Sequence, residues 1–359
     1  MSKSPTLPNK SKGIMHDVEV LRPSDYPDWN NQLAPEAGCS FFHTAQWADV
    51  LTQSYGYRPV YFAIRDTNRI ANLLAVMEVK SFLTGNRGVS LPFTDACEPI
   101  AESAAHFHAL WDQAVTYGKK QRWKYLEVRG GEKYFADNLP FVTHYGHRLD
   151  LEKDTQAIYA RMRESNKRNI NKARKENVEV NISNSADAVK QFCRLNTLTR
   201  RKHGLPPQPR GFFKNLYDRV IAKDMGFIAV ASRGDKILAA NVYLHFGKEV
   251  IYKYGASDQA MQHLRANNLV MWKAIKWSCD RGFQSLSFGR TEMEHQGLMQ
   301  FKSGWAANQY TLSYYRYDLQ KNAFVRGSSD IHPVYKKVFE KLPAPVLNII
   351  GHVLYRHKG

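Results

Sequence analysis

Two stretches of the chain share one hydrophobic pattern. Each holds two apolar runs separated by a short polar turn, which is the pattern of a β-hairpin. The stretches are residues 60–81 (VYFAIRDTNRIANLLAVMEVKS) and residues 227–246 (FIAVASRGDKILAANVYLHF). Further strand-like residues follow each hairpin, at NRGVSLPF in the first half and at EVIYKYGAS in the second. The sequence therefore predicts two similar groups of strands.

A helix is predicted after each group of strands. Apolar residues recur at spacings of three and four in residues 102–121, and again in residues 267–281. Each predicted helix leads to a short strand, KYLEVRG from residue 124 and QSLSFGR from residue 284. The order hairpin, strand, helix, strand thus recurs roughly 165 positions later, which favours an internal duplication. A helix between strands predicts the α/β (α+β) class, with mixed sheets flanked by helices.

Length and charge limit the possibilities further. The chain has 359 residues, enough for two domains of ordinary size. We expect a disordered tail at 1–15, a first domain at 16–150, a second at 151–325, and a basic amphipathic segment at 326–359. Lys and Arg number 51 against 33 Asp and Glu, a formal net charge of +18. Such an excess favours anionic partners: RNA, phosphorylated metabolites or an anionic membrane.

Cysteine and histidine spacing predicts no metal site. Cys39, Cys97, Cys193 and Cys279 lie far apart, and the thirteen histidines form no HxxxH or HExxH motif. The N-terminal residues MSKSPTLPNKSKG are polar and lack the apolar core of a signal peptide. The apolar stretch at residues 343–355 is shorter than the roughly 20 residues that span a bilayer. We therefore expect a cytoplasmic protein.

Basic residues concentrate between Arg161 and Lys175, where seven basic side chains accompany one acid. On one continuous helix, Arg161, Arg168, Lys172 and Lys175 would share a face. Most such runs are solvated helix faces, and no RNP, KH or helix-turn-helix signature accompanies this one. The alternative is a face that contacts phosphate groups.

The chain resembles the Fem-type peptidyltransferases, and most closely the GNAT-type FemAB-like branch of envelope and exopolysaccharide loci. The resemblance covers residues 38–318 and lies in FFHTAQWADVL, SLPFTDACEPI, SNKRNINKARKENVEV, RRKHGLPPQP, VIYKYGAS and GLMQFKSGW. It implies two GNAT-like domains in tandem that transfer an aminoacyl group from aminoacyl-tRNA to an amine of a peptidoglycan or other envelope precursor. It also places the basic run beside the cleft, so we favour Arg168, Lys172 and Lys175 as phosphate- or RNA-binding residues.

The resemblance implies a catalytic pair in MQFKSGW. Phe301 and Lys302 match the family's Phe-Lys pair, whose lysine lies near the acyl carbonyl. Acyl transfer to an amine passes through an oxyanion, which a fixed ammonium can stabilise. Tyr252 and Tyr254 match positions that line the same cleft, although strand packing is the alternative for either one.

The match departs from the family on the acceptor side. A family lysine follows the tryptophan of the first motif by four positions; here Trp47 is followed at that spacing by Leu51. A family arginine before His-Gly binds phosphate; here that position is Lys202, next to Arg201. The family's acid after Gly-Pro aligns with Glu102. Because charge is retained at these positions, we expect the acceptor site to take an anionic acceptor. The residues expected to bind it are Trp47, Arg201, Lys202 and Glu102.

The donor side leaves two alternatives. GNAT enzymes that use acetyl-CoA carry [RQ]xxGx[GA] before a helix whose backbone N–H groups hold the pyrophosphate. The comparable segment is QHLRAN, residues 262–267, where Arg265 replaces the first glycine and would crowd that cradle. We favour aminoacyl-tRNA as the donor and count Arg265 among the phosphate-binding residues; acyl-CoA is the alternative, and neither is a bound cofactor. A catalytically inactive GNAT fold that binds RNA or a membrane is a third possibility.

The segment at 326–359 has basic ends around an apolar set that follows helical spacing from Val346 to Leu354. This pattern suits a helix on the surface of an anionic membrane, where a lipid-linked acceptor would be found. Docking of the same apolar stripe on the second domain is the alternative. The expected partners are thus an anionic acceptor, tRNA and a membrane surface, and not DNA.

Overall fold

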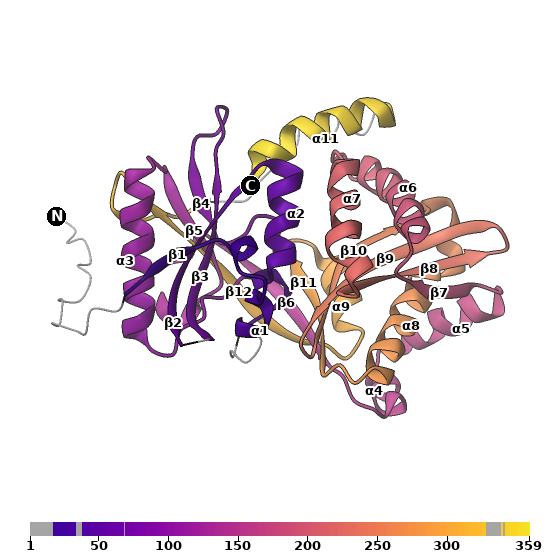
Figure 1. The fold of residues 1–359 in the computed structure, drawn as a ribbon. Coiled ribbons are helices and arrows are strands. Elements are labelled where there is room, and N and C mark those ends of the chain that lie inside the picture. Colours follow the sequence, from indigo (N-terminus) through magenta and orange to yellow (C-terminus); the bar gives the residue numbers. More distant parts are fainter. Residues whose placement is uncertain (1–16, 34–37, 68, 328–338, 340–341) are drawn as a thin grey trace.

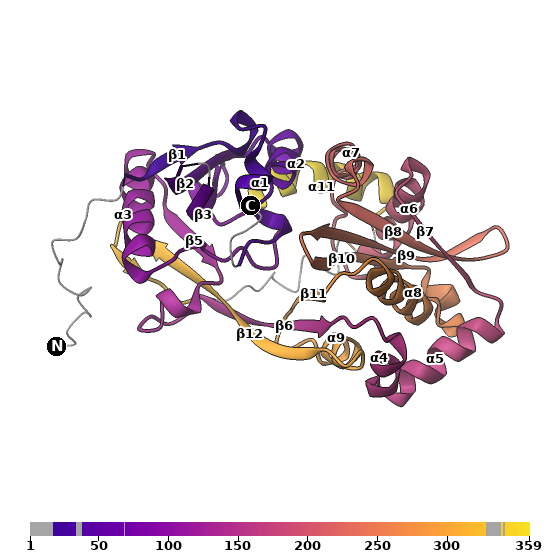
Figure 2. The same ribbon diagram turned by 60° about the horizontal axis from the view of Figure 1, so that its bottom comes forward.

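The computed structural model describes residues 17–33, 38–67, 69–327, 339 and 342–359. The tail expected at 1–15 lies outside these residues. In the described chain, thirteen strands form one mixed sheet in the order β1-β2-β3-β4-β5-β12-β6-β11-β10-β9-β8-β7, with β13 paired to β12. Helices cover both faces of this sheet (Figures 1 and 2). The predicted α/β (α+β) class with flanking helices is confirmed.

The first half contains the first predicted hairpin, as β2 and β3, followed by the predicted helix α3 and strand β5. Its strands are β1 (Glu19–Leu21), β2 (Arg58–Asp66), β3 (Arg69–Val79), β4 (Arg87–Val89), β5 (Tyr125–Arg129) and β6 (Val142–Asp150). Its helices are α1 (Trp29–Leu33), α2 (Ala45–Tyr55) and α3 (Ala104–Lys120).

The second half repeats this plan with hairpin β8–β9, strand β10, helix α8 and strand β11. Its strands are β7 (Glu179–Ser183), β8 (Gly226–Arg233), β9 (Lys236–Phe246), β10 (Glu249–Ser257), β11 (Ser285–Thr291), β12 (Asn308–Asp318) and β13 (Ala323–Phe324). Its helices are α4 (Thr155–Arg161), α5 (Glu164–Lys175), α6 (Ala186–Lys202), α7 (Arg210–Arg219), α8 (Ala266–Asp280), α9 (Gln296–Ser303) and α11 (Ala344–Lys358). In both halves the strand after the helix lies parallel to the strand before it, β5 beside β4 and β11 beside β10.

The two halves exchange their last strands. β6 follows β5 in the sequence but pairs with β11, and β12 follows β11 but pairs with β5. The exchanged strands also pair with each other, antiparallel, from Asn308 opposite Arg148 to Tyr314 opposite Val142. Backbone hydrogen bonds therefore join the halves into one sheet. Each half contains one strand that the other half contributes. The domain boundary predicted at residue 150 therefore stays a prediction from the sequence.

The apolar cores explain the layers. One core lies on a single face of the sheet and extends across both halves beneath α2, α6 and α7. Within it, the rings of Trp47 on α2 and Phe212 on α7 meet edge to face at 6.2 Å. On the opposite face, α3 covers the first half, and α5 and α8 cover the second. The shared core holds the halves together around the space between them.

The basic run does not form one continuous helix. α4 ends at Arg161 and α5 begins at Glu164, with Met162 in an extended conformation between them. Met162 is buried, so the chain turns inward at this point, and Arg161 instead pairs with Glu152 at 2.6 Å. The expectation that Arg161 shares a helix face with Arg168 is therefore wrong.

The C-terminal helix α11 docks across both halves, on α2 and α6. Leu347 and Tyr355 are buried on its inner face, and the Tyr57 hydroxyl donates a hydrogen bond to the Tyr355 carbonyl at 2.7 Å. Gly351 allows this approach, because a Cβ there would collide with the carbonyl of Pro207. The docking alternative for this segment is thus observed, although on both halves rather than on the second alone.

Candidate active site

Strands β10 and β11 separate at the centre of the sheet. Their parallel pairing extends from Glu249 opposite Ser285 to Ile251 opposite Ser287. Beyond this point β10 has a bulge between Tyr252 and Tyr254, so that Lys253 is the extra, unpaired residue. A bulge re-aims the side chain it carries. Here it directs Lys253 toward Asp95 of the first half, at 2.8 Å.

Lys302, a residue of α9, also extends its side chain toward β11 and Asp95. Its side chain is 3% exposed, and its Nζ donates hydrogen bonds to the carbonyls of Gly289 (3.1 Å) and Arg290 (2.8 Å) on β11. Burial lowers the pKa of Lys302 to about 8, and the attraction of Asp95 offsets only part of that effect. An ammonium has three donors, and among the described residues two of them are used in this way. The remaining donor can serve a reacting oxygen.

Asp95 is the acid at the centre of the site. Burial alone would raise the pKa of Asp95, but the positive charges of Lys253, Arg290 and Lys302 hold it below its ordinary value. The close approach depends on Gly289, which has φ +65°; a Cβ there would lie 3.0 Å from the Asp95 carboxyl group. Burial in turn lowers the pKa of Lys253, although its bond to Asp95 acts in the opposite direction. The site is therefore a carboxylate surrounded by three cations, of which Lys253 and Lys302 are buried and Arg290 is partly exposed.

A cationic cleft of about 510 Å³ opens from Asp95 between the two halves. Five basic side chains and one acid line it: Arg129, Arg200, Lys253, Arg290, Lys358 and Asp95. Polar groups of α6 and of the segment after it, such as Asn196 and Gln208, complete one wall. This charge balance suits an anionic ligand, and phosphate in particular.

The arginine of the RRKH motif that faces this cleft is Arg200. Its guanidinium donates to the Tyr355 hydroxyl at 2.7 Å and to the Pro206 carbonyl at 3.3 Å, which fixes its direction. Arg201 and Lys202, which we expected to bind the acceptor, are exposed in the last turn of α6 and do not line the cleft. A helix places successive side chains about 100° apart, so the neighbours of an inward-facing residue point away.

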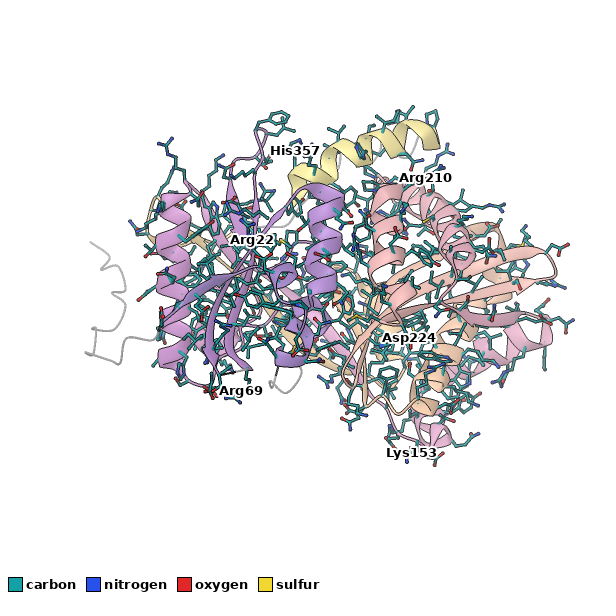
Figure 3. All side chains as sticks on the ribbon, viewed as in Figure 1. Arg22, Arg69, Lys153, Arg210, Asp224 and His357 are labelled. Atoms are coloured by element: carbon teal, nitrogen blue, oxygen red, sulfur yellow. The ribbon has the colours of Figure 1, made fainter. Side chains whose placement is uncertain are left out.

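Two other acceptor residues also lie elsewhere. Glu102 is exposed just before α3 and pairs with Arg69 at 2.9 Å. Figure 3 shows Arg69 at the edge of the first half opposite the end of α11. Trp47 is fully buried in the shared core against Phe41 and Phe42, so it supports the wall of the site without reaching a ligand. The acid of the site is Asp95, seven positions before Glu102 and within the motif SLPFTDACEPI.

The two tyrosines of β10 take different places. Tyr254 lines the cationic cleft. Tyr252 packs in the core of the second half, with its ring 5.6 Å from that of Tyr243, and burial raises its pKa to about 12. Tyr252 therefore packs within the sheet, which is the alternative considered for it from the sequence.

Phe301 and Arg265 line a smaller cavity of about 250 Å³ at the N-terminus of α8. Arg265 adopts a left-handed conformation, φ +58°, and is the N-cap residue of α8. Asn267 donates to the Ser257 hydroxyl at 3.1 Å, which fixes the same helix start. Phe301 thus lines a space at a helix N-terminus, where phosphate groups are favoured, and the next residue, Lys302, bonds to β11 and interacts electrostatically with Asp95 of the cationic cleft.

Arg168, Lys172 and Lys175 are exposed on α5, and we call them the basic face. The inner side of α5 packs on α8 through Asn166, Ile170 and Ala173. The backbone N–H of Arg163, just before α5, donates to the carbonyl of Gly304, which follows α9. The basic face therefore belongs to a helix anchored beside Phe301 and Lys302.

Asp95, Lys253 and Arg290 were not predicted from the sequence. Asp95 and Lys253 stand inside motifs that the resemblance identifies, and Arg290 lies six residues after the start of a predicted strand. A charged residue within an otherwise apolar strand is a usable signal for such positions. His147 was also missed; burial, and then the charge of Lys302, lowers its pKa. The described part of the chain holds no group of three or more His, Cys, Asp or Glu side chains placed to bind a metal ion.

Comparison with known proteins gives relatives in sequence and in fold. Residues 160–303 match the family model of the acetyltransferase (GNAT) domain. A UDP-N-acetylmuramoylpentapeptide-lysine N(6)-alanyltransferase of Weissella viridescens is 27% identical over 148 residues, which is 41% of this chain. The match covers 44% of that enzyme, less than half its length.

Among solved structures, FemX superposes with a TM-score of 0.67 over 82% of this chain and 96% of its own, at 12% identity. L-PGS from Bacillus licheniformis has a TM-score of 0.51 over 93% of this chain and 99% of its own, also at 12% identity. The C-terminal domain of a putative lysylphosphatidylglycerol synthetase from Agrobacterium fabrum has a TM-score of 0.52 over 75% of this chain and 86% of its own, at 10% identity. At these identities the likeness is one of fold. The resemblance to the FemAB/FemX-like transferases is thus confirmed, in fold over most of the chain and in sequence over part of it, and the chain consists of two GNAT-like halves in tandem.

Proposed function

We propose that this protein transfers an aminoacyl group from aminoacyl-tRNA to an amine of an anionic cell-envelope precursor. The observation that carries the proposal is the buried Lys302 ammonium, which two carbonyls of β11 hold and which interacts electrostatically with Asp95, a residue that lines the cationic cleft. The similarity to an alanyltransferase that acts on a UDP-linked peptide agrees with this reaction class.

The chemistry follows from the positions of these groups. The acceptor amine attacks the acyl carbon of the ester, a C–N bond forms, and the negative charge moves to the carbonyl oxygen. The ester C–O bond then breaks, and the proton lost by the amine ends on the departing hydroxyl of the tRNA. The third donor of Lys302 stabilises the oxyanion. Its pKa of about 8 also allows it to pass a proton near neutral pH.

The cationic cleft and the cavity at the start of α8 take different substrates. The cationic cleft takes the anionic acceptor, with Arg200 and Arg129 as phosphate ligands. The cavity at the start of α8 takes the phosphate end of the donor, where Arg265 adds a positive charge to the helix N-terminus. The basic face of α5 extends this surface to the body of a tRNA. Acyl-CoA is the second candidate donor, because residues 160–303 match a GNAT acetyltransferase domain.

One experiment separates these donors. The protein is incubated with UDP-N-acetylmuramoylpentapeptide and either charged tRNA or acyl-CoAs, and loss of the acyl group is recorded. We expect loss from charged tRNA in the natural protein and in Lys273→Met, an exposed lysine of α8, but not in Lys302→Met. Loss from acyl-CoA alone would support the second donor. No loss from either donor, with this and other amine acceptors, would support an inactive fold that only binds RNA or membrane.

A further inference from the structure

Six large apolar side chains are exposed on two segments that are far apart in the sequence. Phe82 (87% exposed) and Leu83 (58%) form the tip of the β3–β4 turn. On α11, Ile349 is 67% exposed and Val353 50%, and Val346 and Leu354 are also exposed. We call these six residues the apical surface. Single exposed apolar residues are ordinary, but a group of this size marks an interaction site.

The two segments are fixed to one another. The Ser81 hydroxyl lies 3.0 Å from Nδ1 of His357 on α11, and the His357 carbonyl accepts hydrogen bonds from Arg87 at 2.6 Å and Thr84 at 3.1 Å. The Phe82 ring meets the His357 ring edge to face at 4.7 Å. Figure 1 shows the β3–β4 turn and α11 projecting from the same edge of the molecule, and Figure 3 labels His357 where they meet. The apical surface is therefore one surface rather than two.

The exposed apolar residues of α11 are not needed for its docking. Leu347, Gly351 and Tyr355 already face the protein and are buried. Ile349 and Val353 follow each other at a spacing of four, so they lie together on the opposite side of the helix. An apolar face that packs on nothing within the described chain costs solubility unless something else covers it.

The charges around this face are positive. Arg356 and Lys358 are exposed on α11, and the sequence from Leu342 to Gly359 contains no acid. Lys80, beside the β3–β4 turn, is 63% exposed and pairs with the buried Glu78 carboxylate at 3.3 Å. Basic residues at the rim of an exposed apolar surface match an anionic layer of lipid headgroups above acyl chains.

We propose that the apical surface binds an anionic lipid bilayer, with α11 lying flat and Phe82 and Leu83 inserted as a second anchor. No helix in the described residues has the length and apolarity to cross a bilayer, so the contact is peripheral. Tyr355 and Lys358 of the same helix line the cationic cleft, which therefore opens beside the headgroups. This inference does not depend on the transfer reaction.

Co-sedimentation tests the proposal with the full chain and vesicles of phosphatidylcholine, with and without phosphatidylglycerol. We expect the natural protein to pellet with the anionic vesicles, and less at high salt. Phe82→Ser/Leu83→Ser and Ile349→Ser/Val353→Ser should each lower the partition coefficient at least about tenfold, since each removes two insertable side chains. Leu139→Ser is the control, because this leucine is 57% exposed and lies outside the apical surface.

A second measurement needs no variant. Hydrogen–deuterium exchange of the natural protein should slow at the β3–β4 turn and along α11 when anionic vesicles are added. Failure of the natural protein to bind at any phosphatidylglycerol content would overturn the proposal, as would unaltered binding by both double variants. A dimer in solution that both double variants disrupt would assign the surface to a second copy of this chain instead.

Discussion

Replacing Lys302 with methionine tests the role of the buried ammonium. Burial lowers the pKa of Lys302 from 10.5 to about 8, which corresponds to roughly 3 kcal/mol of cost for the charged form. The side chain is 3% exposed, so solvent screens little of this cost. Methionine removes the charge but also the hydrogen bonds to the carbonyls of Gly289 and Arg290, worth about 1 kcal/mol each. We therefore expect the variant to be more stable at pH 7 by about 1 kcal/mol.

The change of the free energy of unfolding with pH tests the charge of Lys302 independently. A lysine whose pKa is lower in the folded than in the unfolded chain destabilises the fold while it is charged. This cost is full below about pH 8 and disappears as the pH rises toward 10.5. The natural protein should therefore gain stability relative to Lys302→Met over this window, by up to about 1.4 kcal/mol per pH unit. Urea unfolding of both proteins at neutral pH and near pH 9.5 measures the difference between their free energies of unfolding. The titration of all other groups is common to both proteins and cancels in this difference.

Activity should move in the opposite direction. Loss of one oxyanion-stabilising group lowers the rate on the order of 100-fold or more, so Lys302→Met should be nearly inactive although it is folded. Lys273→Met, on the exposed side of α8, should retain the natural rate. A Lys302→Met protein that reacts within a few-fold of the natural one would refute the assignment. A stability difference that is independent of pH would refute the charged state assigned to this lysine.

Three further predictions concern the surroundings of Lys302. Asp95→Asn leaves the charge of Lys253, which is 6% exposed, without its partner at 2.8 Å. The free energy of unfolding should therefore fall by about 3 kcal/mol, whereas Asp137→Asn, at an exposed position, is the control. An unchanged free energy of unfolding would mean that the pair is solvated. Replacing the three residues of the basic face with Gln should reduce the slope of log K for tRNA binding against log salt concentration by about 0.7 to 0.9 per lost phosphate contact. The same change at Lys119, Lys120 and Arg122 should leave this slope unchanged. Equal slopes for the two variants would mean that the basic face is only solvated. Arg200→Gln should raise the KM for an anionic acceptor at least several-fold while Arg201→Gln leaves it unchanged, and equal effects of the two would contradict the geometry of the cleft.

The local elements could be predicted because their signals lie within a few residues. Both hairpins, α3, α8, β5 and β11 have a period of two or of three to four in their apolar positions, and the structure has them at the predicted places. The break between α4 and α5 was not predicted, since a buried Met162 and a run of helix-compatible residues read as one helix. The placement of Arg201, Lys202 and Glu102 away from the cleft has a similar cause, because alignment to a motif identifies a stretch and not the side chain that turns inward.

The sequence by itself determined the class of fold, the duplication and the excess of positive charge, which are properties of composition and of spacing along one chain. The stretch that holds Lys302 was identified by its resemblance to the Fem-type family. Only the tertiary structure decided the exchange of β6 and β12 between the halves, the meeting of Asp95 with Lys253 and Lys302, and the joining of the β3–β4 turn to α11. Asp95 and Lys253 are 158 positions apart, and His357 lies 276 positions after Ser81. Contacts at such separation depend on how whole elements pack, since loop closure and burial, rather than local preference, set their free energy.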